Sequence, residues 1–68
     1  MIFAEKQWSV EQSKNTYNFK VDSASDIANL PTATEKKSGY TEAAYGSTAI
    51  DMTTGDFYYL RSAGWNKV

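Results

Sequence analysis

The side chains that could carry out catalysis in this chain are carboxylates, lysines and tyrosines, because the sequence contains no His and no Cys. Ser-His-Asp and Cys-His arrangements are therefore excluded. Asp51 and Asp56 flank a predicted turn and could act as a carboxylate pair. Such a pair needs one carboxyl buried enough to raise its pKa, whereas turn ends are usually wet. We interpret both as turn-capping groups that accept from nearby backbone N–H groups, and we predict no catalytic residue and no enzyme.

A second group of oxygen donors is formed by Asp22, Ser23, Ser25 and Asp26, which calcium could bind. The spacing lacks the glycine and the closing glutamate of an EF-hand loop, and helix capping explains the same residues. Zinc sites and disulfides need residues that the sequence lacks, and its glycines are spaced as turn formers rather than as a phosphate loop. We expect no metal and no cofactor.

The charged residues nearly balance, with seven Lys and Arg against eight Asp and Glu and a formal net charge of −1. This composition gives no dominant basic patch, so we expect no nucleic-acid partner. No window approaches the ~20 apolar residues of a membrane span, and the N-terminal residues lack the pattern of a secretory signal. We expect no membrane partner.

Aromatic residues are plentiful, with two Trp, five Tyr and three Phe. An aromatic face of a β protein can stack on sugars or on bases. Trp8, Tyr58 and Trp65 are the candidates for glycan binding. Packing in the core or at an interface is the usual role of aromatic side chains, so glycan binding is kept as the alternative interpretation.

Alternation of apolar and polar residues predicts a hairpin at the N-terminus. In the first segment the alternation is imperfect, because Phe3 and Lys6 fall on the wrong sides. After a polar run of loop composition, residues 16–22 form the cleanest half-buried strand of the sequence. We expect Tyr17 and Phe19 from this strand to lie in the core.

A short helical turn is predicted after the hairpin. Ser23 or Ser25 can accept from the free N–H groups of a first turn, and Ile27 and Leu30 lie three residues apart, so both can face the core. The proline that follows Leu30 disfavours helical geometry there and ends the turn. Residues 31–46 are then read as a long loop that is functional, mobile or clamped by a neighbour.

The C-terminal part is predicted to be a three-stranded antiparallel meander over residues 47–52, 56–61 and 65–68. Gly55 and Gly64 occupy the two turns, where a positive φ is accessible at little cost. The middle strand is apolar on both faces and therefore needs cover on both. The whole chain, residues 1–68, is thus expected to be one small, mainly β domain.

Two sets of residues follow from this interpretation. The predicted core consists of Tyr17, Phe19, Ile50, Phe57, Tyr59 and Trp65. The predicted interface consists of Phe3, Trp8, Tyr58 and Leu60. A slip of one residue in the middle strand of the meander would exchange its two faces, so the assignment of that strand depends on register.

Four stretches near the C-terminus form a joint pattern: Gly46-Ser47-Thr48-Ala49-Ile50-Asp51, Thr54-Gly55-Asp56, Tyr59-Leu60 and Gly64-Trp65-Asn66-Lys67-Val68. The pattern resembles small structural proteins of tailed bacteriophages, which are typically encoded among head and tail genes. The upstream stretch with Val21-Asp22-Ser23, Asp26-Ile27 and Leu30-Pro31 is similar to the segment that commonly precedes that hairpin. Together the matches cover about half of the chain, whereas the first twenty residues match no pattern.

The resemblance implies a non-enzymatic virion component, such as a capsid accessory or decoration subunit, a head-fibre base or a connector piece. It also implies that the partners are the major capsid protein or head, connector or fibre proteins, and that the chain is made in the host cytoplasm and located in the virion. The alternative, from a different class, is a virion-surface recognition module that binds host glycan. A free inhibitor of a host enzyme fits the size but not the weak net charge.

Chain length favours a partner independently of the resemblance. A chain of 68 residues buries only about 60% of the surface of its unfolded state. Small domains usually compensate with disulfides, a metal or a partner, and the partner is the solution favoured here. We predict a homo-oligomer or a lattice-bound subunit whose open strand edges and outer aromatic faces bury against a neighbour.

Overall fold

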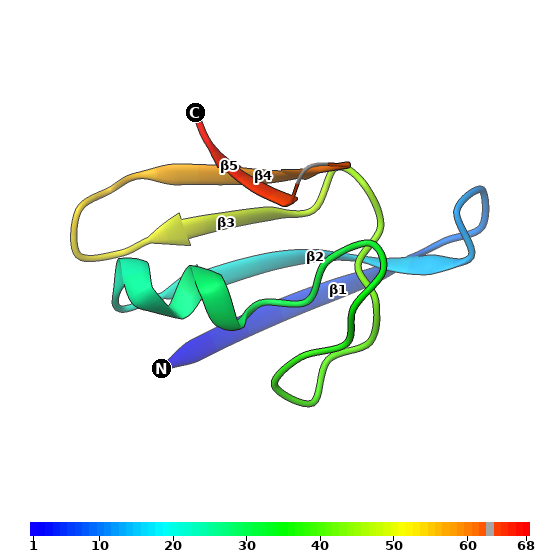
Figure 1. Ribbon diagram of the computed structural model, residues 1–68, viewed down its shortest axis with the longest axis horizontal. Coiled ribbons are helices and arrows are strands. Elements are labelled where there is room, and N and C mark those ends of the chain that lie inside the picture. Colours follow the sequence, from blue (N-terminus) through cyan, green and yellow to red (C-terminus); the bar gives the residue numbers. More distant parts are fainter. Residues whose placement is uncertain (63) are drawn as a thin grey trace.

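The computed structural model describes residues 1–62 and 64–68 and shows one mixed five-stranded sheet in the order β1-β2-β3-β4-β5 (Figure 1). Its elements are β1 (Ile2–Ser9), β2 (Lys14–Val21), the 3₁₀ turn η1 (Ala24–Asn29), β3 (Thr48–Asp51), β4 (Phe57–Arg61) and β5 (Gly64–Lys67). The predicted mainly β fold, with an N-terminal hairpin, a short helical turn and a C-terminal meander, is confirmed. Ala63, in the second predicted turn, lies outside the described residues.

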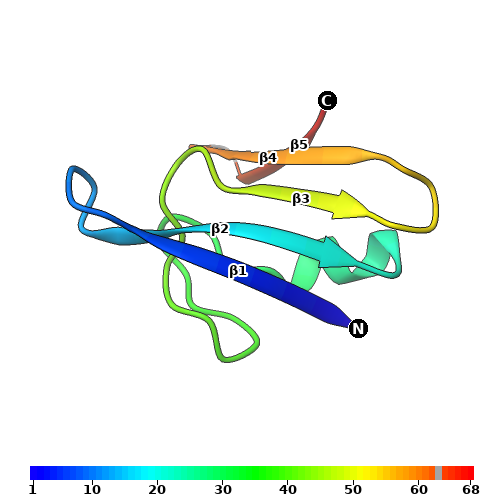
Figure 2. The same cartoon turned by 180° about the vertical axis from the view of Figure 1, so that it is seen from behind.

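The hairpin and the meander belong to a single sheet because β2 and β3 pair in parallel, from Asn18 opposite Thr48 to Val21 opposite Asp51. The sequence did not predict this pairing. Parallel neighbours cannot be joined by a tight turn and need a crossover of a dozen or more residues. Residues 22–47 form that crossover, and η1 and the loop lie on the same face of the sheet (Figures 1 and 2).

The first part of the crossover is shaped by its capping residues. Ser23 has extended backbone geometry, and its Oγ accepts from the backbone N–H of Ser25 at 3.3 Å. Leu30 is also extended, as expected for a residue before proline, and its N–H donates to the carbonyl of Ile27 at 3.2 Å. Ile27 and Leu30 are both buried, so the predicted inward orientation of the turn is correct.

The core lies between the crossover and the face of the sheet that it covers, which we call the covered face. Its buried residues are Tyr17, Phe19, Val21, Ile27, Leu30, Ala43, Ala49 and Leu60. The rings of Tyr17 and Phe19 stack with centroids 4.9 Å apart, and Tyr40 and Trp65 meet Phe19 edge-on at 5.1 and 5.9 Å. These aromatic contacts join the strands to the loop.

The long loop forms hydrogen bonds to other parts of this chain. The Tyr17 hydroxyl forms a hydrogen bond with Thr41 Oγ1 at 3.0 Å, and Ser38 Oγ donates to the carbonyl of Asn29 at 2.8 Å. Trp65 Nε1 donates to the carbonyl of Pro31 at 2.9 Å. The loop that the sequence left open as functional, mobile or clamped is therefore fixed within the same molecule.

The prediction for β4 was wrong about which face is which. Ala49 faces the core and stands opposite Tyr58, so Tyr58 points to the covered face, and the fully buried Leu60 follows two residues later. Phe57 and Tyr59, predicted as core, lie on the opposite face. Ile50 lies there too, because alternation along β3 turns Ala49 inward.

Two polar residues, one in β3 and one just before it, explain the error. Alternation places Ser47, Ala49 and Asp51 on one face, which reads as the polar, outward one. In the structure Ser47 and Asp51 are fully buried, and their side-chain oxygens accept hydrogen bonds from backbone N–H groups. Ser47 Oγ accepts from the Tyr17 N–H at 3.0 Å and donates to the carbonyl of Ala44 at 2.7 Å. The bond to Tyr17 links the residue before β3 to β2, just before the parallel pairing of the two strands begins.

This role of Ser47 predicts a stability loss. Ser47→Ala leaves the buried N–H of Tyr17 without an acceptor, and we expect the free energy of unfolding to fall by about 1–3 kcal/mol in urea titrations. The matched control is Ser62→Ala at an exposed position, with an expected change within about 0.5 kcal/mol. Equal stabilities for the two variants would contradict the role assigned to Ser47.

Candidate functional site

The face of the sheet opposite the crossover, which we call the open face, is crossed by no other described element. Figure 2 shows the strands in front and the crossover behind them. The 3₁₀ turn and the loop of residues 22–47 thus cover one face, while side chains of the other face remain in contact with solvent. A sheet with one face on the core normally carries polar residues on its solvated face. An open face that bears apolar residues is therefore a candidate site for binding.

An apolar row runs across one end of the open face. The pairing register sets Phe3 opposite Lys20, Lys20 opposite Ile50, and Ile50 opposite Phe57. Val68 continues the row, since its N–H donates to the carbonyl of Phe57 at 2.9 Å. Phe3 and Phe57 are 56% and 54% exposed. The alkyl stem of Lys20 can lie along its apolar neighbours while its ammonium stays in water, so the row forms one surface.

A polar row lies beside the apolar one. It consists of Glu5, Asn18, Thr48, Tyr59 and Asn66, each opposite the next on adjacent strands. Thr48 Oγ1 donates to Asn18 Oδ1 at 2.7 Å, and the guanidinium of Arg61 lies 5.6 Å from the ring centre of Tyr59. The open face therefore combines an apolar row with a row of hydrogen-bonding groups.

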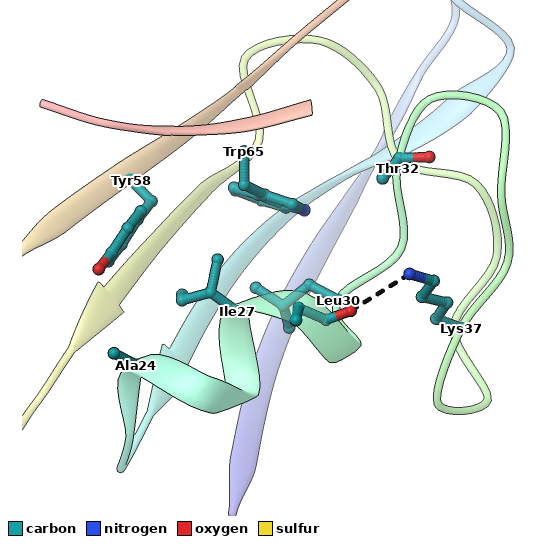
Figure 3. Close-up of a pocket in the computed structure, with 8 residues that line it drawn as sticks. Ala24, Ile27, Leu30, Thr32, Lys37, Tyr58 and Trp65 are labelled. Carbon is teal, nitrogen blue, oxygen red and sulfur yellow. Dashed lines mark hydrogen bonds between the residues drawn. The ribbon is translucent and has the colours of Figure 1, made fainter. Parts of the chain in front are cut away.

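A groove of about 460 Å³ lies on the covered face between η1 and strands β4 and β5 (Figure 3). Tyr58 and Trp65 face Ile27 and Leu30 across it. Two of its polar groups have partners in this chain: Trp65 Nε1 donates to the Pro31 carbonyl, and Lys37 Nζ donates to the carbonyl of Ala28 at 3.2 Å. The groove is therefore mainly an apolar hollow beside the core.

The four predicted interface residues do not gather at one place. Phe3 lies in the apolar row, whereas Tyr58 lines the groove on the other face. Leu60 is only 2% exposed and belongs to the core, so its assignment to an interface was wrong. Trp8 is exposed near the hairpin turn, opposite Asn15. The glycan candidates are separated as well, because Trp8 is on β1 while Tyr58 and Trp65 are on β4 and β5 at the other side of the sheet.

The predicted core residues divide in the same way. Tyr17 and Phe19 are buried, and Trp65 packs against them from β5. Ile50, Phe57 and Tyr59 lie on the open face. The signal that could have identified the open face was the small size of Ala49, which leaves room on its side of β3 for a covering segment.

The carboxylates of Asp51 and Asp56 form hydrogen bonds within the turn that joins β3 to β4. Asp51 Oδ1 accepts from the backbone N–H groups of Thr53 and Thr54 at 2.9 and 3.4 Å. Asp56 Oδ2 accepts from the Thr54 hydroxyl at 3.0 Å and lies 3.3 Å from Lys67 Nζ. The Thr54 hydroxyl and, second, the Lys67 ammonium hold the pKa of Asp56 below its usual range. Both residues thus cap the turn around Gly55, which has φ +80°.

Asp22 and Asp26 both form ion pairs with the amino group of Met1. The ammonium of Met1 lies 3.4 Å from Asp22 Oδ2 and 3.3 Å from Asp26 Oδ2. Ser23 and Ser25, the other two oxygen donors of the predicted cluster, bond to each other at 2.9 Å. No cluster of three or more acidic residues suited to a metal ion occurs within residues 1–62 and 64–68.

No protein-family model matches this chain, and comparisons with curated proteins and with solved structures gave no match. Among the described residues, no helix has the length and apolar character needed to cross a membrane.

The environment of Asp56 predicts a dependence of stability on pH. Because its folded-state pKa is depressed, the carboxylate stabilises the fold above its unfolded-state pKa, and this contribution is lost as the pH falls through the folded-state value. We expect Asp56→Asn to have a lower free energy of unfolding than the parent near about pH 6. This difference should shrink as the pH falls through the folded-state pKa of Asp56.

Urea titrations at a series of pH values from about 6 downward measure this difference in the free energy of unfolding. Glu11→Gln, at an exposed position, is the matched control, and we expect it to follow the parent throughout. A stability difference for Asp56→Asn that does not change with pH would contradict the assignment.

Proposed function

We propose that this chain is a non-enzymatic structural subunit of a bacteriophage virion that binds a neighbouring protein through its open face. The observation that carries the proposal is the apolar row, in which Phe3 and Phe57 each expose more than half of their surface on a face that the described chain leaves uncovered. Exposed apolar surface of this kind typically marks a protein–protein contact, and aromatic residues are frequent anchors in such contacts.

The distribution of burial supports an assembly role. On the covered face, eight buried residues and the loop complete a core from one chain. The shortage of buried surface expected for a chain of 68 residues is therefore concentrated on the open face. A protein seated there would remove Phe3, Ile50 and Phe57 from water, which is the favourable term that the isolated chain lacks.

The resemblance to phage structural proteins concerns the elements that form much of this face. The matching stretches at 46–51, 54–56, 59–60 and 64–68 contain β3, the Gly55 turn, part of β4 and β5. A capsid accessory or fibre-base role, in contact with capsid, connector or fibre proteins, agrees with this location. The virion is then the proposed place of action, after synthesis in the host cytoplasm.

The alternative function is recognition of host glycan at the virion surface, and the polar row is the observation that favours it. Asn18, Thr48 and Asn66 place amide and hydroxyl groups beside the ring of Tyr59, and such groups can both donate to and accept from sugar hydroxyls. This arrangement differs from the Trp8, Tyr58 and Trp65 set that the sequence suggested.

The two functions are separated by substitutions in the encoding phage. We expect Phe57→Ser to lower the number of copies of the subunit per purified particle, because loss of an aromatic anchor typically weakens binding by about tenfold or more. Quantitative mass spectrometry of the particles gives the copy number. Trp8→Ser removes a comparably exposed aromatic residue on the opposite side of β1 from Phe3 and should leave the copy number unchanged.

Particles without the parent chain, or with an unchanged number of Phe57→Ser copies, would contradict the proposed assembly role. Particles that retain Phe57→Ser or Asn66→Ala subunits but lose adsorption to cells would instead support glycan recognition.

A further inference from the structure

We propose that the protein covering the open face is a second copy of this chain, packed sheet against sheet about a two-fold axis that runs parallel to β3. The inference rests on the proposed function, because it names the partner of the same surface. Two sheets that pack face to face lie about 10 Å apart with their strands aligned to within about 30°. The resulting dimer is a ten-stranded sandwich with two covered outer faces.

The register makes the apolar row complementary to itself. Ile50 is on β3, the middle strand, and the strands on either side follow in the order β2, β1 and β4, β5. An axis along β3 therefore places β2 of one copy over β4 of the other, and β1 over β5. Ile50 then meets Ile50 of the second copy, and Lys20 meets Phe57 of the second copy on both sides of the axis.

The charges of the open face fit the same arrangement. The ammonium of Lys20 comes over the ring of Phe57, where a cation–π contact is favourable. In the polar row Glu5 comes opposite Asn66, so its charge meets an amide. Arg61, one row further along β4, comes opposite the Thr16 position of β2. No charged residue of the face meets its own sign.

A two-fold axis perpendicular to the strands is less favourable. An axis along the polar row would place Phe3 against Gln7 and Phe57 against Arg61 of the second copy, and the apolar row would no longer meet itself. An axis along the apolar row would keep that row against itself but would set Lys20 against Lys20 of the second copy. The axis parallel to β3 is therefore selected, because it keeps the apolar row against itself and sets no like charges opposite each other.

The available area suits a reversible dimer. Five strands at about 4.8 Å spacing give a face about 24 Å wide, and three rows of side chains extend about 15 Å along the strands. Two such faces cover about 720 Å² in total, which is below the roughly 1,000 Å² of a stable specific interface and is typical of a weak, reversible contact. The groove of Figure 3 is a weaker candidate for a second copy, because Trp65 Nε1 and Lys37 Nζ already donate to carbonyls of the same chain.

Cross-linking tests the position of the axis. The chain has no cysteine, so a single introduced thiol reports on its own neighbourhood. Ile50→Cys lies on the axis, and we expect a short bismaleimide to convert it into covalent dimers. A direct disulfide is not expected, because facing sheets lie about 10 Å apart and disulfides need Cα atoms within about 7 Å. Lys6→Cys, exposed on the other face, should give only background dimer.

Analytical ultracentrifugation of the full chain over a concentration series tests the contact itself. We expect a reversible monomer–dimer equilibrium that Phe57→Ser weakens by about tenfold or more, whereas Trp8→Ser, on the opposite side of β1 from Phe3, leaves it unchanged. Circular dichroism checks that each variant is folded. Ile50→Arg, which brings two like charges together at the axis, should abolish the dimer.

A chain that stays monomeric at every concentration, or that cross-links as well through Lys6→Cys as through Ile50→Cys, overturns the dimer. The proposed function would survive that result if Phe57→Ser still lowered the number of copies on particles. A dimer whose chain is missing from particles would overturn the virion role and leave the dimer standing.

Discussion

The parallel pairing of β2 with β3 is the constraint on which the rest of the structure depends. Two parallel strands that are neighbours in a sheet require a long connection, and here residues 22–47 provide it. The connection passes over one face only. One choice of strand pairing therefore decides which side chains form the core and which stay in contact with solvent on the open face.

The crossover holds its position because it is bonded at both ends and along its length. Ser23 begins the 3₁₀ turn, Trp65 binds the carbonyl of Pro31, and Ser47 links the last loop residues to β2. Around these bonds the rings of Phe19 and Tyr40 pack edge to face. The covered face is thereby completed within this chain, whereas Phe3 and Phe57 remain exposed on the other side of the sheet.

Local features of the sequence predicted the local structure well. The alternation around Tyr17 and Phe19 identified β2, Ser23 and the proline after Leu30 bounded the short turn, and Gly55 marked a tight connection. The candidate site was less accessible to prediction. β4 is apolar on both faces, so its pattern does not indicate whether Phe57 or Tyr58 points inward. The orientation is set by the parallel pairing of β2 with β3, which joins segments some thirty residues apart in the sequence. Ser47 and Asp51 look like surface residues in the sequence, although both are buried and form hydrogen bonds with backbone groups.

The central claim is that the open face is closed by the same face of a second molecule. The most direct measurement is an isotope-filtered nuclear Overhauser experiment on a mixture of labelled and unlabelled chains, which reports only contacts between molecules. Our account gives cross-peaks between the side chain of Lys20 in one copy and the ring of Phe57 in the other. Intermolecular cross-peaks confined to residues of the groove or of the hairpin turn, or none at all at millimolar concentration, would contradict it.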